Sequence, residues 1–347
     1  MKRINIIIST LLFMLLPSSL WAGGFRYFYH QLTDQEKVIY DAFANCKDLL
    51  QVTIDKPLLI PVTGNGTAIV TYGDYESGAW HPKSASIYKG LDAQRVRALD
   101  AFTLDDSENY WIAGNDGTIN FTFDFVNAAN TNSKKSPVRV SIADITAAPF
   151  PYYEGIKKEV VAVSSALDKM EDELAGKMSA VKTRYDSLKI IHDAIVTLAS
   201  YQWKENLPAH TLTGIMLDKY GHKSVCDGYA KLFKLFCDRF DIPCIKVTGV
   251  AKTMKFVEKT MVDGPHIWNN VLMEDGSWYI VDVTWDDILT KPKEMTSIEY
   301  FLVGSDDLDR FGMTIASHYK SIGVMSSGVP YKHFTLPVVS KKGYKKK

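Results

Sequence analysis

Three residues in one stretch of the chain have the types and the order of an acyl-transfer triad. Cys226 lies in SVCDGYAKLFKLF, His266 in GPHIWNNV and Asp282 in WYIVDVTWDD. A cysteine attacks an amide or ester carbonyl as a thiolate, a histidine can carry the proton, and a carboxylate can hold the imidazole in one tautomer. These residues are therefore candidates for a nucleophile, a general base and acid, and an orienting group.

The residues around Cys226 predict a helix that begins just before it. Ser224, with Asp227 three positions later, resembles a capping box, and apolar residues recur at helical spacing from Tyr229 onward. Cys226 would then be the second residue of the helix, where backbone N–H groups favour an anion and the N–H of Cys226 could donate to an oxyanion. A helix end contributes only about 0.3–2 kcal/mol, so a thiolate also needs a cationic imidazole.

Two β-rich runs on either side of the tripeptide Glu274-Asp275-Gly276 predict a β-hairpin. A two-residue loop would leave His266 and Asp282 on opposite faces of the sheet, because successive side chains alternate between faces. A three-residue loop puts both on one face, on the diagonal, with Cβ atoms roughly 7 Å apart. We therefore predict a three-residue loop with Gly276 in a left-handed conformation.

Three separated blocks resemble the bacterial transglutaminase-like superfamily: SLKIIHDAIVTLASYQ, VCDGYAKLFKLFCDRFDIPCIKVTGVA and HIWNNVLMEDGSWYIVDVTWDD. The resemblance covers residues 183–303 and implies an α+β, papain-like core in which a nucleophile helix packs on an antiparallel sheet. It also implies that Cys226, His266 and Asp282 form a catalytic triad. One departure is Asp241, where such proteins often carry glycine; an aspartate can adopt that left-handed cap at modest cost.

The chemistry implied by the triad has two outcomes. Attack by Cys226 on an amide bond of a protein or peptide substrate would give a thioester. Water would resolve it in a protease or amidase, and an amine would resolve it in a cross-linking protein-glutamine gamma-glutamyltransferase. We favour hydrolysis, because aminolysis requires a site that excludes water. A non-catalytic module that binds cell-wall peptide or another protein is the alternative. Neither route requires a cofactor, and no Cys or His pair has zinc-site spacing.

Other residues near the triad have two interpretations each. Trp268 and Trp285 flank His266 and Asp282, so they are candidates for substrate-binding walls that exclude water, or they belong to the core. His192 lies in a predicted helix and is expected to make a buried hydrogen bond rather than to take part in catalysis. Asp286 and Asp287 could bind a cation, but an ordinary acidic loop is the simpler interpretation.

Several smaller expectations concern packing around the candidate nucleophile and the other cysteines. Gly228 is expected to permit close packing beside Cys226, and His318 is expected to be structural. Cys226 must stay free for the mechanism, so at most one disulfide could form among Cys46, Cys237 and Cys244. Cys237 falls on the predicted nucleophile helix and Cys244 at the start of the next strand, so both are expected to be buried free thiols.

The first 22 residues resemble a signal peptide, which predicts a secreted or periplasmic protein. Lys2 and Arg3 precede an apolar run over residues 6–16, and Ala22 offers a small residue for cleavage. The run is short for a membrane span, although a retained N-terminal anchor is the alternative. No later stretch is long and apolar enough to cross a membrane.

Composition and pattern predict two regions after the signal peptide. The 347 residues are 46% hydrophobic and carry 40 basic and 40 acidic side chains, so nothing indicates nucleic acid. Residues 23–150 predict a small α+β or mostly β accessory region, and residues 151–340 the transglutaminase-like domain, divided near residues 147–151. The basic tail, residues 341–347, is expected to be solvated, or to be attracted weakly to an anionic surface. The sequence indicates no oligomeric state.

Finer patterns place individual elements within these regions. A helix is predicted over residues 34–49, and strands over residues 67–72, 118–125 and 138–142. Helical sequence runs over residues 155–200 and is expected to break near Gly176.

Overall fold

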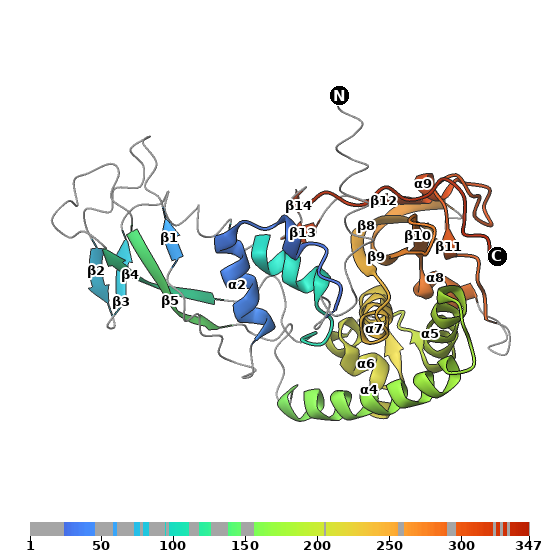
Figure 1. Ribbon diagram of the computed structural model, residues 1–347, viewed down its shortest axis with the longest axis horizontal. Helices are drawn as coiled ribbons and strands as arrows, with labels where there is room; N and C mark the ends of the chain where they lie inside the picture. The colour runs from blue at the N-terminus through green and yellow to red at the C-terminus, as the bar shows by residue number, and fades with distance from the viewer. Residues whose placement is uncertain are drawn as a thin grey trace. The chain divides into compact units, whose positions relative to one another are not determined.

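A computed structural model of the chain describes most of its residues, namely 24–45, 58–60, 73–76, 79–82, 94, 97–110, 118–125, 138–146, 156–204, 206–255, 260–289, 296–321, 324–326, 329–331 and 334–346. The predicted signal peptide, Cys46, the strand predicted over residues 67–72 and the boundary near residues 147–151 lie outside these residues. The chain divides into two compact units, which are described separately (Figure 1). One unit holds Phe28–Thr103 and Trp111–Ile156, and the other holds Met1–Tyr27, Leu104–Tyr110 and Lys157–Lys347.

The first unit combines helices with a small antiparallel sheet. Its described elements are η2 (Tyr29–Gln31), α2 (Asp34–Ala44), β1 (Leu58–Ile60), β2 (Gly73–Glu76), β3 (Ala79–Pro82), β4 (Thr118–Phe125) and β5 (Val138–Thr146). Strands β1, β5 and β4 form one sheet in that order, and β2 pairs with β3. The strands predicted over residues 118–125 and 138–142 are confirmed, and the predicted helix at residue 34 begins there.

Helix α2 begins with a capping box, in which Thr33 and Glu36 satisfy each other's backbone N–H groups. Its buried face carries Tyr40 and Phe43, and each of these rings lies 5.5 Å from the ring of Phe102, centroid to centroid. These aromatic contacts join α2 to the helical residues 97–103 of the same unit.

The second unit carries the motifs described above and is built from helices around a five-stranded antiparallel sheet. Its helices are α4 (Ile156–Met178), α5 (Arg184–Leu198), η4 (Leu207–His210), α6 (Leu212–Met216), η5 (Asp218–Tyr220), α7 (Cys226–Arg239), α8 (Val283–Leu289) and α9 (Ile315–His318). The break predicted near Gly176 falls between α4 and α5.

The sheet of the second unit has the strand order β11-β10-β9-β8-β12, and neighbouring strands are antiparallel. These strands are β8 (Cys244–Lys255), β9 (Thr260–Leu272), β10 (Trp278–Val281), β11 (Phe301–Val303) and β12 (Tyr319–Ser321). Two smaller ladders join β6 (Ser200–Tyr201) to β7 (Lys223–Ser224), in parallel, and β13 (Val324–Ser326) to β14 (Val329–Tyr331).

Helix α7 packs against this sheet, as predicted for the nucleophile helix (Figure 1). Leu232, Phe233 and Phe236 lie on its buried face, and all three are fully buried. Asn269 of β9 donates a hydrogen bond of 3.1 Å to the backbone oxygen of Ala230, which fixes the helix to the strand. The second unit is therefore an α+β fold with a helix packed on an antiparallel sheet.

The predicted capping box at the start of α7 is wrong. Val225 is the N-cap residue and no side chain caps the helix, so Cys226 is its first residue rather than its second. Ser224 instead donates its hydroxyl to the backbone oxygen of Ala209 at 2.8 Å. A Cβ atom on Gly228 would lie 2.0 Å from Ser224 Oγ, which confirms the expected close packing beside the nucleophile.

Helix α7 ends at Arg239, and Phe240 is its C-cap residue. Asp241 has a φ of 56°, so the aspartate adopts the left-handed conformation that was predicted for it. Cys237 of α7 and Cys244 of β8 are buried free thiols, as expected.

Within the second unit, a buried lysine forms hydrogen bonds to residues 104–110. Lys246 of β8 is 1% exposed, and its Nζ donates to the backbone oxygen of Asp106 and to Ser107 Oγ, both at 3.0 Å. Burial and then the charge of Lys231 lower the pKa of Lys246 to about 7.

The described lysine side chains of the basic tail are exposed, as expected, and hydrogen bonds of its backbone hold it against the second unit. The N–H of Asp306 donates to Lys341 O at 2.8 Å, and the N–H of Tyr344 donates to Leu302 O at 2.9 Å. The side chain of Lys342 is 70% exposed. Among the described residues, no helix is both long enough and apolar enough to cross a membrane.

Candidate active site

Cys226 is placed at the N-terminal end of α7 by the short strand β7 that precedes it. Because it is the first helical residue, its backbone N–H has no acceptor within the helix and remains a candidate oxyanion donor. The thiol is free and partly exposed. This position combines the access that a substrate needs with the positive end of a helix dipole.

The loop between β9 and β10 brings His266 and Asp282 to one face of the sheet. The N–H of Met273 donates to Ser277 O and the N–H of Gly276 donates to Met273 O, both at 3.0 Å. Gly276 has a φ of 78°. The predicted three-residue loop with a left-handed glycine is therefore confirmed.

His266 lies between the carboxylate of Asp282 and the thiol of Cys226. Its Nε2 is 2.6 Å from Asp282 Oδ2, and because the carboxylate can only accept, Nε2 carries a proton and Nδ1 is left for the thiol. Burial lowers the pKa of His266, but the charge and hydrogen bond of Asp282 and the hydrogen bond with Cys226 outweigh it and raise the pKa to about 10. The imidazole is therefore cationic at neutral pH.

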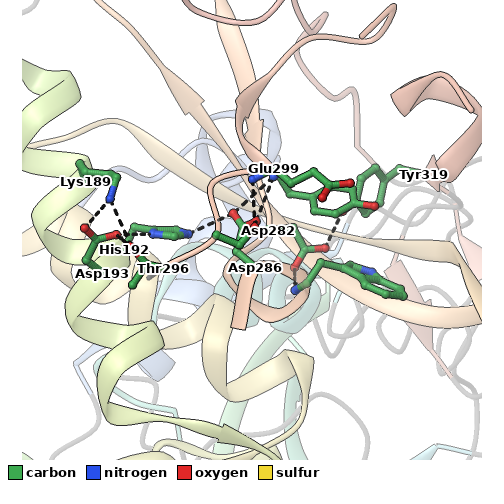
Figure 2. A network of polar contacts seen from close by, with 11 residues as sticks. Lys189, His192, Asp193, Asp282, Asp286, Thr296, Glu299 and Tyr319 are labelled. Carbon is green, nitrogen blue, oxygen red and sulfur yellow. Dashed lines mark hydrogen bonds and ion pairs between the residues drawn. The ribbon is translucent and has the colours of Figure 1, made fainter. Parts of the chain in front are cut away.

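Asp282 receives hydrogen bonds on both of its oxygens, and Figure 2 shows two of these contacts. Oδ1 accepts the N–H of Trp285 at 3.1 Å, as an N-cap residue of α8 would, and Oδ2 accepts the hydroxyl of Tyr319 at 2.7 Å. Burial raises the pKa of Asp282, but His266, Tyr319 and the Trp285 N–H together hold it below its usual range. This carboxylate is 1% exposed and stays ionised.

Aromatic rings enclose the imidazole. The rings of Trp268 and Tyr319 lie nearly parallel to that of His266, each with a centroid distance of 6.2 Å and with interplanar angles of 20° and 23°. Trp268 is 3% exposed, so it is placed as a wall against the histidine. Trp285 is half-buried and packs against Tyr300 at 6.0 Å. Substrate binding by either tryptophan stays a prediction.

A second buried histidine lies beside this cluster, on α5 (Figure 2). His192 Nδ1 is 2.9 Å from Asp193 Oδ1 and His192 Nε2 is 3.1 Å from Asp286 Oδ2. The prediction of a buried hydrogen bond is confirmed. Asp286 also accepts the hydroxyl of Ser297 at 2.9 Å and the N–H of Tyr300 at 3.1 Å.

Asp286 and Asp287 do not form the acidic loop that the sequence suggested, because both are buried in α8. Asp287 accepts the hydroxyl of Tyr229 at 2.6 Å. Among the described residues, no group of three or more His, Cys, Asp and Glu could hold a metal ion. His318 is buried with its Nδ1 2.9 Å from Asp309 Oδ2, which agrees with the expected structural role.

Two residues near the site were missed by the sequence analysis. Tyr319 lies 37 positions from Asp282, and no local pattern connects them. Trp203 is 70% exposed and packs against Tyr201 with ring centroids 4.8 Å apart. Tyr201 pairs with Ser224, two residues before Cys226, so this exposed indole follows a strand that is adjacent to the nucleophile. No sequence pattern identified Trp203, because its exposure depends on the fold.

Comparison with known proteins shows which family this part of the chain resembles. A sequence profile of the transglutaminase-like superfamily matches residues 172–283, which include Cys226, His266 and Asp282. Kyphoscoliosis peptidase of Homo sapiens is 30% identical over 151 residues, which are 41% of this chain and 22% of that protein. Kyphoscoliosis peptidase of Mus musculus is 38% identical over 65 residues, 18% of this chain and 10% of that protein. The chain thus spans at most about a fifth of the length of these relatives.

A solved structure described as a TGase is also similar to the chain. It has 14% sequence identity and a TM-score of 0.29, and the match covers 52% of this chain and 47% of that one. The profile match over residues 172–283 supports the family assignment by itself. The chain therefore carries a domain of the transglutaminase-like superfamily.

Proposed function

We propose that the chain is an exported cysteine acyl-transfer enzyme that acts on amide bonds of protein or peptide substrates, with hydrolysis as its main outcome. The observation that carries the proposal is the continuous contact from thiol to imidazole to carboxylate. His266 interacts with Cys226 and lies 2.6 Å from Asp282. A cationic imidazole beside a thiol at a helix N-terminus favours the thiolate, which is the nucleophilic form.

In the first step, the thiolate of Cys226 attacks the carbonyl carbon of the substrate amide. The C–N bond breaks, His266 gives its Nδ1 proton to the leaving amine, and a thioester remains on the sulfur. The backbone N–H of Cys226 is a proposed donor to the oxyanion. Asp282 keeps its hydrogen bond to Nε2 throughout, so the imidazole presents Nδ1 to the reaction.

In the second step, His266 takes a proton from the incoming nucleophile. A water molecule attacks the thioester carbon, the C–S bond breaks, and the carboxylic acid product leaves while the thiolate is restored. An amine in place of water would give a cross-linked product instead. Trp203 is proposed to contact the substrate, because it is 70% exposed on a segment next to the nucleophile.

The proposal is tested by incubating the full chain with a dansylated amine and a mixed protein acceptor. Wild type is compared with Cys226→Ala, and Cys237→Ala serves as a matched control because Cys237 is buried away from the site. New fragments that require Cys226 would support hydrolysis, and dansyl labelling that requires it would support transfer. Neither product, together with a Cys226 that reacts with iodoacetamide no faster than a free thiol, would leave only a binding module.

Export is a separate part of the proposal and rests on residues 1–22. Expression in a bacterial host, followed by fractionation and mass measurement of the N-terminus, tests it. Cleavage after Ala22 with release from the membrane supports export as a soluble enzyme. A mature chain that keeps residues 1–22 in the membrane fraction would support an anchored protein instead.

A further inference from the structure

The carboxylate of Asp282 has a third partner that comes from a distant strand. Tyr319 lies on β12, which pairs with β8, and residue 319 is opposite Ala251 there. Its hydroxyl reaches Asp282 Oδ2 at 2.7 Å, and this is the same oxygen that lies 2.6 Å from His266 Nε2. One carboxylate oxygen is therefore shared between the candidate base and a tyrosine.

Tyr319 also controls the space around the imidazole. Its ring is nearly parallel to the ring of His266 and lies 4.9 Å from the ring of Trp268, centroid to centroid. It is 5% exposed, so water does not compete for the contact with Asp282. Burial and the charge of Asp282 raise the pKa of Tyr319 well above its ordinary value, so its hydroxyl is protonated and donates near neutral pH.

Further titratable groups face this pair from the neighbouring elements. The ring of His318, at the end of α9, is 4.6 Å from that of Tyr319, and its Nδ1 is bonded to Asp309. The ring of Tyr300 meets Tyr319 edge-on at 6.1 Å. Asp286 of α8 contributes a negative charge that helps to keep Tyr319 protonated. His266 is the titratable group at the pair itself, through its 2.6 Å contact with Asp282.

We propose that Tyr319 is a positioning residue of the site. Its hydroxyl holds the Asp282 carboxylate in the orientation that His266 requires and takes up part of the negative charge of that carboxylate. The inference rests on the function proposed above. A donor to Asp282 Oδ2 leaves less charge there to oppose a second anion, the thiolate of Cys226, so the hydroxyl widens the pH range in which the thiolate forms.

The test is the pH dependence of iodoacetamide alkylation of Cys226 in the full chain, followed by mass spectrometry of the Cys226 peptide. In Tyr319→Phe the ring stays but the donor is lost, so we expect the profile to move to higher pH by about 0.5 unit or more. Tyr300→Phe is the matched control. It removes a buried hydroxyl that has no hydrogen-bond partner among the described residues, and its profile should stay in place.

A stronger hydrogen-bond donor at position 319 should shift the alkylation profile of Cys226 in the opposite direction. Replacement of Tyr319 by 3,5-difluorotyrosine keeps the shape of the ring and makes the hydroxyl a better donor, so the profile should move to lower pH. Opposite shifts in these two variants support the proposal. Shifts of the same sign, no shift, or an equal shift in Tyr300→Phe would overturn it, because a tyrosine that only fills space would produce one of these results.

The same assay separates this proposal from the proposed function. If wild-type Cys226 reacts no faster than a free thiol near neutral pH, the thiolate mechanism fails and the role of Tyr319 fails with it. If Cys226 is reactive and Tyr319→Phe has the wild-type profile, only the role of Tyr319 fails.

Discussion

Two buried histidines in the same unit differ in the hydrogen-bond partners of their two ring nitrogens. His192 has a carboxylate on each nitrogen, from Asp193 and Asp286. His266 has a carboxylate only on Nε2, and its other neighbour is the thiol of Cys226. Carboxylates accept but do not donate, so His192 is held as an imidazolium with no nitrogen left to exchange a proton with a substrate.

The difference teaches that a buried, carboxylate-bonded histidine is not by itself a sign of catalysis. Both pKa values are raised despite burial, because in both cases the carboxylates outweigh the desolvation of the charged ring. What distinguishes His266 is that one nitrogen faces a partly exposed nucleophile at a helix end. His192 joins α5 to α8 and so supports the helix that follows Asp282.

The largest expected effect comes from removing the histidine that faces the thiol. In His266→Gln, the alkylation rate of Cys226 at pH 6 should fall by about 100-fold, because a thiol without a cationic neighbour is almost entirely protonated there. Peptide-level mass spectrometry measures the rate. His192→Gln, assayed at a temperature where it is folded, should keep the wild-type rate; an equal loss in both variants would end the distinction between the two histidines.

The stability of the same two variants should rank in the reverse order. His192→Gln breaks two contacts between the imidazole and carboxylates, one to Asp286 in the core and one to Asp193, whose side chain is 35% exposed, so its unfolding free energy should fall by about 3–5 kcal/mol. His266→Gln breaks one such contact, and Asp282 keeps its bonds from Trp285 and Tyr319, so this variant should lose less. Urea denaturation followed by circular dichroism measures both, and a smaller loss in His192→Gln would contradict this assignment.

The next prediction isolates the carboxylate of the site. Asp282→Asn keeps a good N-cap residue for α8 but removes the charge, so the pKa of His266 should fall from about 10 by at least about 2 units. NMR titration of the ring proton of His266 measures the shift. The ring of His192, bonded to other carboxylates, should titrate as in wild type, and a change at both rings would mean that the clusters are coupled.

Lys246 extends the comparison to a buried base whose hydrogen bonds, among the described residues, go to a backbone oxygen and a hydroxyl rather than to a carboxylate. Its pKa is about 7 in the folded protein, so between pH 7 and 9 the unfolded chain binds more protons there than the folded chain does. Unfolding free energy should therefore rise with pH, by at most about 1.4 kcal/mol per unit. Lys246→Met should remove this slope in urea titrations at several pH values. If the unfolding free energy of the variant still rises with pH, the pH dependence comes from groups other than Lys246.

The residues that could be predicted from the sequence are those whose position depends on local pattern. The loop at Gly276 follows from strand alternation once His266 and Asp282 must share a face. The left-handed Asp241 was implied by the resemblance, because such proteins often carry glycine at this position after the helix. The order of Cys226, His266 and Asp282 was available from motif and spacing alone.

The residues that could not be predicted depend on tertiary contacts. Ser224 resembles a capping residue, but its hydroxyl bonds to Ala209, which only the fold brings close. Tyr319 reaches Asp282 from the edge strand β12, and its hydroxyl has no sequence signature. Asp286 looked like part of an acidic loop because nothing local reveals that His192 pairs with it.

The length of the loop at Gly276 determines which face of the sheet Asp282 occupies. Strand β10 is buried throughout, so a one-residue slip would not push an apolar side chain into water. Insertions of one, two and three residues after Asp275 should therefore alternate in effect. Odd insertions should abolish the reactivity of the Cys226 thiol, and even insertions should restore it. Natural length variation at this turn should then come in steps of two wherever the chemistry is kept.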